Sequence, residues 1–342
     1  MAGKWLCWLE DLGKEQSDMV GKKCANLGEM TKIGLPVPHG FALSLDAYTL
    51  FMEETGATDK MRAHIKSCGA SLDTIAGINE LSQALRRIVE SKPVPPEMAA
   101  TILLHYEELC DRCSALDVAV STRSAGAVSH PGQYETHLNV KGGTDLLDRI
   151  KKVWSSSFNP TSLSFRKQKG LPLERDPIGV AVLKMVNART AGIVFTADPN
   201  TGDMTRMIME ANWGLGESVV GGESMPDTYV VDKTTFKVVE RRLGTKLMCV
   251  LPSERGVIEQ ETPQDRSCTF CLSDEEAAEI AKVGVRLENH FGVPQDVEWA
   301  IDNDLSFPNN VILLQTRHEV MAKKKAPVDQ LLDMMMTRYV KT

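Results

Sequence analysis

The sequence lacks the short motifs that mark several large enzyme classes. It has no Gly-x-x-x-x-Gly-Lys-Ser/Thr run, which excludes a P-loop nucleotide site. No Gly-x-Gly-x-x-Gly follows a predicted strand in a βαβ setting, which argues against a Rossmann dinucleotide site. His-Glu-x-x-His and Gly-x-Ser-x-Gly are also missing, which disfavours zincins and α/β-hydrolases. A catalytic site must therefore be assembled from residues dispersed along the chain.

Long apolar runs and excess positive charge are missing as well. No apolar stretch approaches the roughly 18–20 residues needed to span a bilayer, and the N-terminus lacks the apolar core of a signal peptide. The formal net charge is −7, so a general nucleic-acid-binding role is not expected. We therefore expect a cytoplasmic protein with no membrane and no nucleic-acid partner, in which an anionic ligand needs a local cluster of positive groups.

Cysteine is sparse, with eight residues at irregular spacing. This usage fits reduced thiols in a cytosolic protein. Two pairs have CxxC spacing, Cys110–Cys113 and Cys268–Cys271, but they lie far apart in sequence and a zinc site needs four ligands. Their role is left open, with small core residues as the simpler interpretation.

The composition that remains is that of an ordinary globular protein, with 42% hydrophobic and 25% charged residues. Leu27, Met30 and Ile33 recur every three residues, which predicts a helix within 20–34 and opens a mostly helical first third. Lys22 and Lys23 stand at the start of this helix, where backbone amides and a lysine charge favour anions. A solvated lysine pair is the alternative.

Strand patterns begin near residue 118. The strand from Val118 runs past Arg123 into small and hydroxylated residues, which let backbone amides approach a phosphate closely. Residues 129–136 read as a functional loop or a surface loop, and 212–222 as a glycine-rich loop. Residues 250–271 are polar and predict a loop with weak strand character, and Ser273 opens a helix with a capping box.

A β-hairpin is predicted over 296–302 and 311–317. The first arm alternates, so one face holds Val297, Trp299 and Ile301 and the other holds Asp296, Glu298 and Ala300. Gln315 and Arg317 share a face of the second arm. Pairing the arms places a carboxylate, an amide oxygen and a guanidinium together, which suits a metal–polyphosphate site. On the hairpin alone, a charged and solvated face is the simpler interpretation.

Six ordered blocks resemble the ATP-binding part of phosphoenolpyruvate synthase, pyruvate phosphate dikinase and rifampin phosphotransferase. The resemblance covers about residues 20–320. The matching blocks are Gly21–Gly28, Gly34–Phe41, Ser121–Ala127 with Pro131–Thr136, Trp213–Glu217, Asp296–Trp299 and Leu314–Arg317.

The resemblance implies an α+β fold of the ATP-grasp type, in which two lobes with mixed or antiparallel sheets clasp the nucleotide. The implied N-terminal lobe is 1–185, with the helical layer and the phosphate-binding loop. The C-terminal lobe is 186–320, with the metal-binding hairpin. The tail, 321–342, is a possible partner-docking segment.

The resemblance also implies ATP and Mg²⁺ as cofactors, and it assigns roles residue by residue. Lys23 matches the lysine that reaches the ATP phosphates, and Lys22 is expected to share its role because the family's Gly-Gly-Lys-Gly is here Gly-Lys-Lys-Cys. The expected phosphate contacts, of which Lys23, Arg123 and Arg317 are catalytic, are Lys22, Lys23, Arg123, Gly132, Thr136 and Arg317. Glu298 and Gln315 match the Mg²⁺ ligands.

The segment Leu183, Lys184, Met185 and Val186 matches the hinge between lobes that meets the adenine. The synthase group often has Gln at the position of Leu183, so backbone groups are expected to make the adenine hydrogen bonds here.

Family members continue into a swivelling domain with a phosphorylated histidine, and this sequence does not contain one. The resemblance therefore favours a free-standing ATP-grasp subunit, as in phenylphosphate synthase, that phosphorylates a histidine on a separate swivelling partner subunit while ATP becomes AMP and phosphate. The expected final acceptor is phenol. The alternatives are the ATP-binding subunit of a split phosphoenolpyruvate synthase or other dikinase, with pyruvate as acceptor, and a non-catalytic ATP-sensing subunit.

Overall fold

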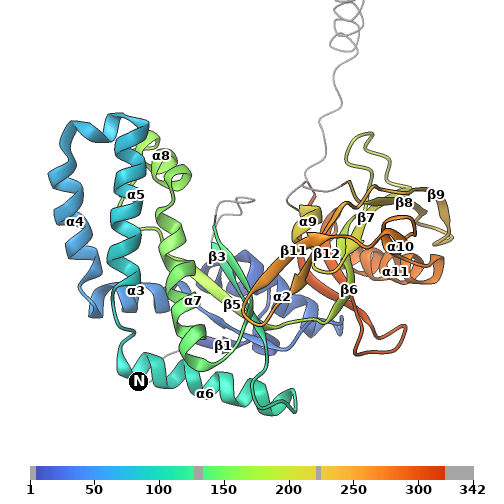
Figure 1. Cartoon of the computed structure of the whole chain (residues 1–342), viewed down its shortest axis with the longest axis horizontal. Helices are drawn as coiled ribbons and strands as arrows, with labels where there is room; N and C mark the ends of the chain where they lie inside the picture. The colour runs from blue at the N-terminus through green and yellow to red at the C-terminus, as the bar shows by residue number, and fades with distance from the viewer. Residues whose placement is uncertain (1–4, 127–133, 221–224, 320–342) are drawn as a thin grey trace, which may run out of the picture.

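Two antiparallel sheets organise the molecule. A computed structural model describes residues 5–126, 134–220 and 225–319. The first sheet has the order β1-β2-β5-β3-β4 (Figure 1). Its strands are β1 (Leu6–Trp8), β2 (Gly40–Leu43), β5 (Ile178–Lys184), β3 (Val120–Gly126) and β4 (Thr136–Val140). The central strand β5 reads as a near-continuous apolar run because it is buried.

The second sheet has the order β13-β12-β6-β7-β8-β9. Its strands are β13 (Val311–His318), β12 (Gln295–Asp302), β6 (Ala188–Phe195), β7 (Arg206–Trp213), β8 (Asp227–Asp232) and β9 (Val238–Arg242). Strands β5 and β6 are joined by the short segment 185–187, so the chain crosses from one sheet to the other there.

A layer of helices packs on the first sheet. Its apolar faces form one core with β2, β3 and β5, in which Phe51 and Trp154 stack with ring centroids 4.9 Å apart. The layer consists of α3 (Leu45–Glu54), α4 (Ala57–Cys68), α5 (Ile75–Glu90), α6 (Pro96–Arg112), α7 (Gly143–Ser155) and α8 (Pro160–Gln168). The expected helical first third is confirmed.

Helix α2 (Lys22–Lys32) lies between the two sheets, as Figure 1 shows, preceded by the short α1 (Ser17–Val20). Its buried face, which includes Leu27 and Met30, shares one core with Ala181 of β5 and Trp299 of β12. The amide of Asn26 also donates to the Thr316 carbonyl at 2.8 Å. The second sheet is covered on the same side by α11 (Asp274–Phe291), and its predicted capping box is confirmed, since Ser273 Oγ accepts from the Glu276 amide and Glu276 accepts from the Ser273 amide.

The hairpin β12–β13 forms as predicted, with Glu298 opposite Gln315. Val297, Trp299 and Ile301 are buried in the core beneath it. A β-bulge follows Glu298, because Trp299 pairs with Leu313 and Leu314 is the extra residue. No helix within the described residues is long and apolar enough to cross a membrane.

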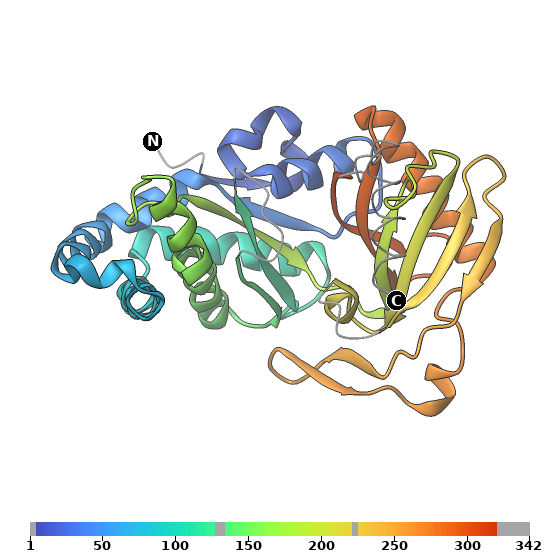
Figure 2. The same cartoon turned by 90° about the horizontal axis from the view of Figure 1, so that it is seen from above.

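The segment after residue 247 corrects one prediction. Instead of a loop with weak strand character, 248–261 form a two-stranded hairpin, β10 (Met248–Pro252) and β11 (Val257–Glu261), followed by α10 (Gln264–Ser267). Figure 2 shows this hairpin extending from the second sheet toward the first. Polar, exposed β11 carries little apolar alternation, which is why the sequence reads as a loop.

Candidate active site

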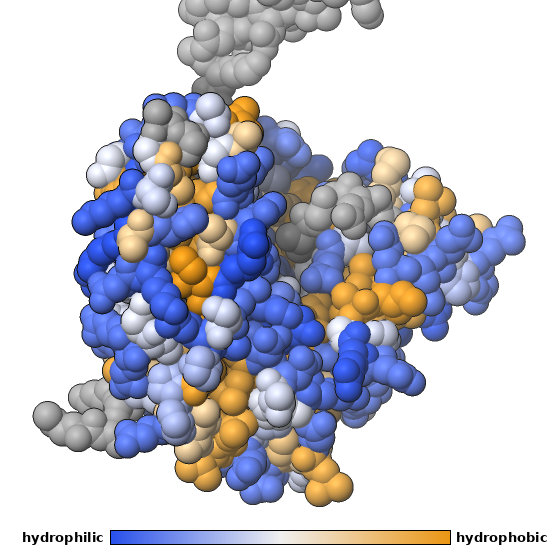
Figure 3. All heavy atoms as spheres, turned by 60° about the vertical axis from the view of Figure 1, so that its left-hand side comes forward, coloured by the Kyte–Doolittle hydropathy of each residue, from blue (hydrophilic) through white to orange (hydrophobic). Residues whose placement is uncertain are grey.

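A cavity of about 900 Å³ lies between the two sheets. Its walls come from α2, from β3, β4 and β5 of the first sheet, from β6, β12 and β13 of the second, and from the β10–β11 hairpin. Figure 3 shows the surface hollowed between the two halves of the molecule, with apolar side chains exposed on both sides of the hollow. We refer to this cavity as the cleft.

Charged groups from both sheets meet at one end of the cleft. Arg123 of β3 donates from Nη2 to Glu298 Oε2 at 2.5 Å and to Gln315 Oε1 at 3.3 Å, and from Nη1 to the Leu314 carbonyl at 2.9 Å. The side chains of Arg123 and Glu298 are only 15% and 19% exposed. One guanidinium therefore links the first sheet to both residues predicted as metal ligands.

Local backbone geometry explains this convergence. Glu298 and Gln315 are register partners on adjacent strands, so their side chains share the face that looks into the cleft. The bulge at Leu314 turns the carbonyl of this residue out of the β12–β13 ladder, and the carbonyl accepts a hydrogen bond from Arg123 there. Trp299, fully buried on the opposite face, fixes the strand beneath.

Lys23 reaches the cleft from the first turn of α2. Gly21 precedes the helix with φ +81°, and a Cβ there would lie 2.2 Å from the Ala125 carbonyl oxygen, so only glycine allows this approach of α2 to β3. Burial, together with the neighbouring Arg123 guanidinium, lowers the pKa of Lys23 to about 8, although Glu298 opposes the change. A bound polyanion would favour its charged form.

Burial works to raise the pKa of Glu298, but the Arg123 guanidinium overcomes it, with help from Lys23 and Arg317, so the pKa is lowered. Glu298 is therefore an ionised oxygen donor at neutral pH. Three cations, Lys23, Arg123 and Arg317, face two carboxylates, Glu298 and Asp296, so this end of the cleft attracts polyanions.

Arg317 also lines the cleft and forms an ion pair with Asp296, which lies opposite it on β12. Its Nε and Nη2 both lie 2.6 Å from Asp296 Oδ2. Burial raises the pKa of Asp296, and the ion pair with Arg317 opposes the rise. Asp296 thereby positions Arg317, a role that the sequence motif did not assign to it.

The other end of the cleft is apolar. Several of its lining residues belong to a small core cluster. This cluster joins the hinge segment to the β10–β11 hairpin and to β12 and β13. The members are Val186, Ala188, Ala191, Leu215, Val250, Ala300 and Ile312, with Leu138, Met185 and Leu314 packed against them. The amide of Met185 donates to the Ala119 carbonyl at 2.8 Å, which holds the hinge against the first sheet. A flat, apolar ligand group fits this end.

The predicted site residues gather at the cleft with two exceptions. Those that line it are Lys23, Arg123, Thr136, Leu183, Lys184, Met185, Val186, Glu298, Gln315 and Arg317. Lys22 is exposed and is not among the lining residues, because neighbouring positions on a helix point in different directions. Gly132 lies outside the described residues.

Several lining residues were not predicted. Val250, Val257 and Glu259 come from the β10–β11 hairpin, Leu215 comes from the predicted glycine-rich loop, and Glu217 begins the short helix α9 (Glu217–Val220) that forms within that segment. The Trp213–Glu217 block was a usable signal for the loop. The hairpin gave none, because β11 has no apolar periodicity.

The residues present fit a magnesium ion bound together with a polyphosphate. Within the described residues, no cluster of three or more His, Cys, Asp or Glu side chains could hold a metal alone. Glu298 and Gln315 supply two hard oxygen donors at one point, which matches the way Mg²⁺ is held by few protein ligands plus phosphates and water. Arg123 Nε is buried without a partner beside them and offers a donor to a ligand oxygen.

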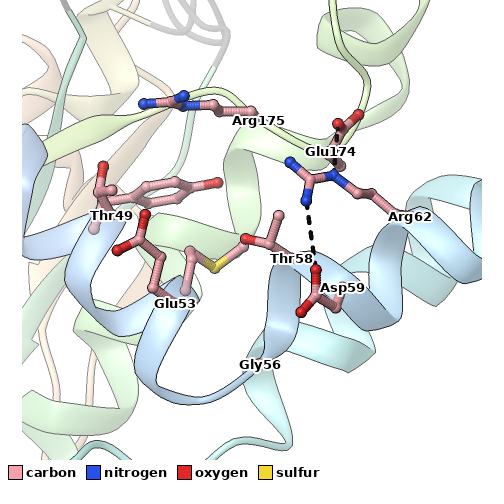
Figure 4. A pocket seen from close by; sticks show the side chains of 10 residues that line it. Thr49, Glu53, Gly56, Thr58, Asp59, Arg62, Glu174 and Arg175 are labelled. Atoms are coloured by element: carbon pink, nitrogen blue, oxygen red, sulfur yellow. Dashed lines mark hydrogen bonds and ion pairs between the residues drawn. The ribbon is translucent and has the colours of Figure 1, made fainter.

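A second cavity of about 250 Å³ lies among α3, α4 and the segment before β5 (Figure 4). Arg62 there is paired with Asp59 at 3.4 Å and with Glu174 at 3.2 Å. None of the predicted site residues lines this cavity.

All eight cysteines are free thiols.

Comparison with known proteins identifies the family. Residues 17–337 match the family described as pyruvate phosphate dikinase, AMP/ATP-binding domain. The chain is 35% identical to a probable phosphoenolpyruvate synthase of Methanocaldococcus jannaschii, over 94% of this chain and 27% of that protein. It is 34% identical to a probable phosphoenolpyruvate synthase of Staphylothermus marinus, over 95% of this chain and 43% of that protein. It is 32% identical to the phosphoenolpyruvate synthase of Aeropyrum pernix, again over 95% and 43%.

The chain thus spans less than half the length of these relatives. The predicted resemblance to phosphoenolpyruvate synthase and pyruvate phosphate dikinase is confirmed, and so is the α+β class, with two antiparallel sheets and a helical layer. The chain belongs to the AMP/ATP-binding domain family of pyruvate phosphate dikinase, and its fold is of the ATP-grasp type.

Proposed function

We propose that the chain binds ATP with Mg²⁺ in the cleft and transfers a phosphoryl group to a histidine on a separate swivelling partner subunit. The observation that supports this most is the meeting of three cations with Glu298 and Gln315 at one end of a cleft whose other end is apolar. That division matches a nucleotide with a charged tail and a flat base. The proposed lobes are 1–185 and 186–320, with 321–342 available for the partner.

In the proposed complex, Lys23, Arg123 and Arg317 bind phosphate oxygens and offset the charge that develops during transfer. Glu298 and Gln315 would hold Mg²⁺, which would neutralise phosphate charge when bound. The hinge 183–186 would contact the base. Thr136 and Gly132 would cover the phosphates. No nucleophile from this chain is required for such a transfer.

The proposed reaction has three steps. The partner's histidine nitrogen attacks the β-phosphorus, the bond between that phosphorus and the oxygen bridging to the α-phosphate breaks, and AMP leaves. The pyrophosphoryl-histidine then loses its terminal phosphate to water, which leaves phosphohistidine and inorganic phosphate. Phosphohistidine phosphorylates the final acceptor.

Two acceptors are candidates. The sequence resemblance to the free-standing subunit of phenylphosphate synthase favours phenol. The names of the relatives, phosphoenolpyruvate synthases, favour pyruvate. Because the acceptor meets the partner and not this cleft, the geometry described here suits either.

The test is to mix the protein with ATP, Mg²⁺ and candidate histidine-bearing partners, with phenol or pyruvate, and to follow the nucleotide product. AMP and phosphate that depend on the partner are expected, and dependence on one acceptor identifies it. ADP as sole product, or binding of ATP without turnover for every partner, would contradict the transfer role. The second of these results would indicate an ATP sensor.

A further inference from the structure

The β10–β11 hairpin is rooted in the second sheet. The Leu215 amide donates to the Val250 carbonyl at 2.8 Å, and Asn212 Nδ2 donates to the Met248 carbonyl at 2.9 Å. From this root the hairpin extends toward the first sheet (Figure 2). It contributes Val250, Val257 and Glu259 to the wall of the cleft.

The tip of the hairpin is fastened to the first sheet through one residue, Asn139 of β4. Its Nδ2 donates to the Ser253 carbonyl at 2.6 Å and to the Gly256 carbonyl at 2.9 Å. In return the Gly256 amide approaches the Asn139 carbonyl at 3.4 Å. Asn139 is 5% exposed and adopts a left-handed backbone at φ +54°. We call this set of contacts the latch.

The two strands of the hairpin differ in burial, since Cys249 and Val250 of β10 are buried at the root and β11 has no buried residue. Every residue of β11 is exposed, and Ile258 is 52% exposed. A two-stranded hairpin of this kind has marginal stability by itself. Neutral hydrogen bonds of modest net strength, as in the latch, open more readily than a buried ion pair.

We propose that the hairpin is a gate over the apolar end of the nucleotide pocket, and that Asn139 is the positioning residue that keeps it shut. This inference rests on the proposed nucleotide site. When the latch opens, Val257 and Glu259 move away from the cleft while Val250 stays at the root, and the base of the nucleotide gains an exit. The latch therefore sets the rate of nucleotide exchange while leaving the phosphate end intact.

The variant that isolates the latch is Asn139→Gly. Glycine tolerates the left-handed backbone, so the change removes the amide without adding strain. Asn139→Asp is the second variant, because it keeps the shape but replaces the donor with an acceptor facing two carbonyls. Asn200→Gly, at an exposed position in the turn after β6, is the matched control.

The experiment measures association and dissociation of a fluorescent ATP analogue by stopped flow, with Mg²⁺ present. Loss of two ordinary hydrogen bonds predicts a dissociation rate about tenfold faster for both Asn139 variants, a faster association rate, and control rates equal to wild type. Dissociation within twofold of wild type would overturn the gate, as would faster dissociation with unchanged association, which describes a fixed wall. No binding to the wild-type protein would overturn the proposed function itself.

A second measurement reports on the hairpin without nucleotide. Arg255 is exposed at the tip, so trypsin cleavage after it measures opening. Faster cleavage in Asn139→Gly, slowed by ATP, is expected. Equal cleavage in Asn139→Gly and the control would contradict the latch.

Discussion

The two sheets touch across the cleft in two chemically different ways. At the phosphate end, the Arg123 guanidinium contacts the charged Glu298, the amide oxygen of Gln315 and a backbone carbonyl, and the pair is mostly buried. At the apolar end, the neutral amide of Asn139 contacts two carbonyls at the tip of the β10–β11 hairpin, which is rooted in the second sheet. The first contact uses groups that the ligand itself would engage, whereas the second uses groups that lie outside the pocket.

This difference indicates that the two contacts have separate roles. Bound Mg²⁺ and phosphates would take over the partners of the charged contact, so that contact changes whenever the ligand binds. The Asn139 contact has no such competitor and depends only on the hairpin. Substitutions at the phosphate end should therefore alter chemistry and affinity, and those at the latch should alter exchange.

The largest expected effect is at Glu298. Glu298→Gln removes the negative charge from the proposed metal site but keeps the side-chain shape and an oxygen acceptor for Arg123. AMP formation with a competent partner should fall by at least about 10²-fold, the scale for losing a preorganised electrostatic group. Rates measured against Mg²⁺ concentration check this, with Asn200→Gly as control. Activity close to wild type, with an intact fold by thermal unfolding, would remove Glu298 from the mechanism.

The next effect concerns Asp296, which fixes Arg317. Asp296→Asn exchanges a charged pair with two contacts of 2.6 Å for a neutral one. We expect affinity for ATP to fall by roughly 10- to 100-fold, because charge-assisted hydrogen bonds contribute about 1.5–3 kcal/mol. Equilibrium titration checks it, and an Arg317→Ala variant should show no further loss from Asp296→Asn. Additive losses would mean that Asp296 acts elsewhere.

Lys23 gives a pH dependence of intermediate size. Its pKa in the free protein is lowered to about 8, so the charge is present below pH 8 and is lost as the pH rises through that value. ATP affinity should fall by about tenfold between pH 7 and pH 9. Lys23→Arg should flatten the profile, since arginine stays charged. A profile of equal slope in both proteins would rule out Lys23 as the titrating group.

The smallest effect is the coupling between the two contacts. Arg123→Met and Asn139→Gly share no partner, so their effects on the free energy of unfolding should add within about 0.5 kcal/mol. Urea unfolding of the single and double variants measures this. A coupling energy well above that value would show that the two contacts open together, which would contradict their separate roles.

The phosphate end of the site could be predicted because the periodicity of strands and helices determines which side chains lie on the same face. Alternation on β12 and β13 placed Glu298 beside Gln315, and the helix start placed Lys23 near a strand ending in small residues. The convergence of these elements came from the order of motifs, since no local pattern reports that Arg123 crosses to the other sheet.

The apolar end could not be predicted to the same degree. β11 is held by its partner strand, and the turn before it is held by Asn139; neither contact leaves a period in the sequence. The bulge at Leu314 depends on strand register. Helix packing likewise decides that Lys23, and not Lys22, points into the cleft. Asp296 stood in a recognised motif, but its role as the support of Arg317 became visible only through their contact.

The most direct test of the account is a calorimetric titration of the protein with ATP, with and without Mg²⁺. We expect one site, with binding strengthened by Mg²⁺ and weakened by at least about tenfold in Arg123→Met, which loses a charge-assisted phosphate contact. Binding that is indifferent to Mg²⁺ and unchanged in Arg123→Met would contradict it, because ATP would then occupy a place other than the cleft between the two sheets.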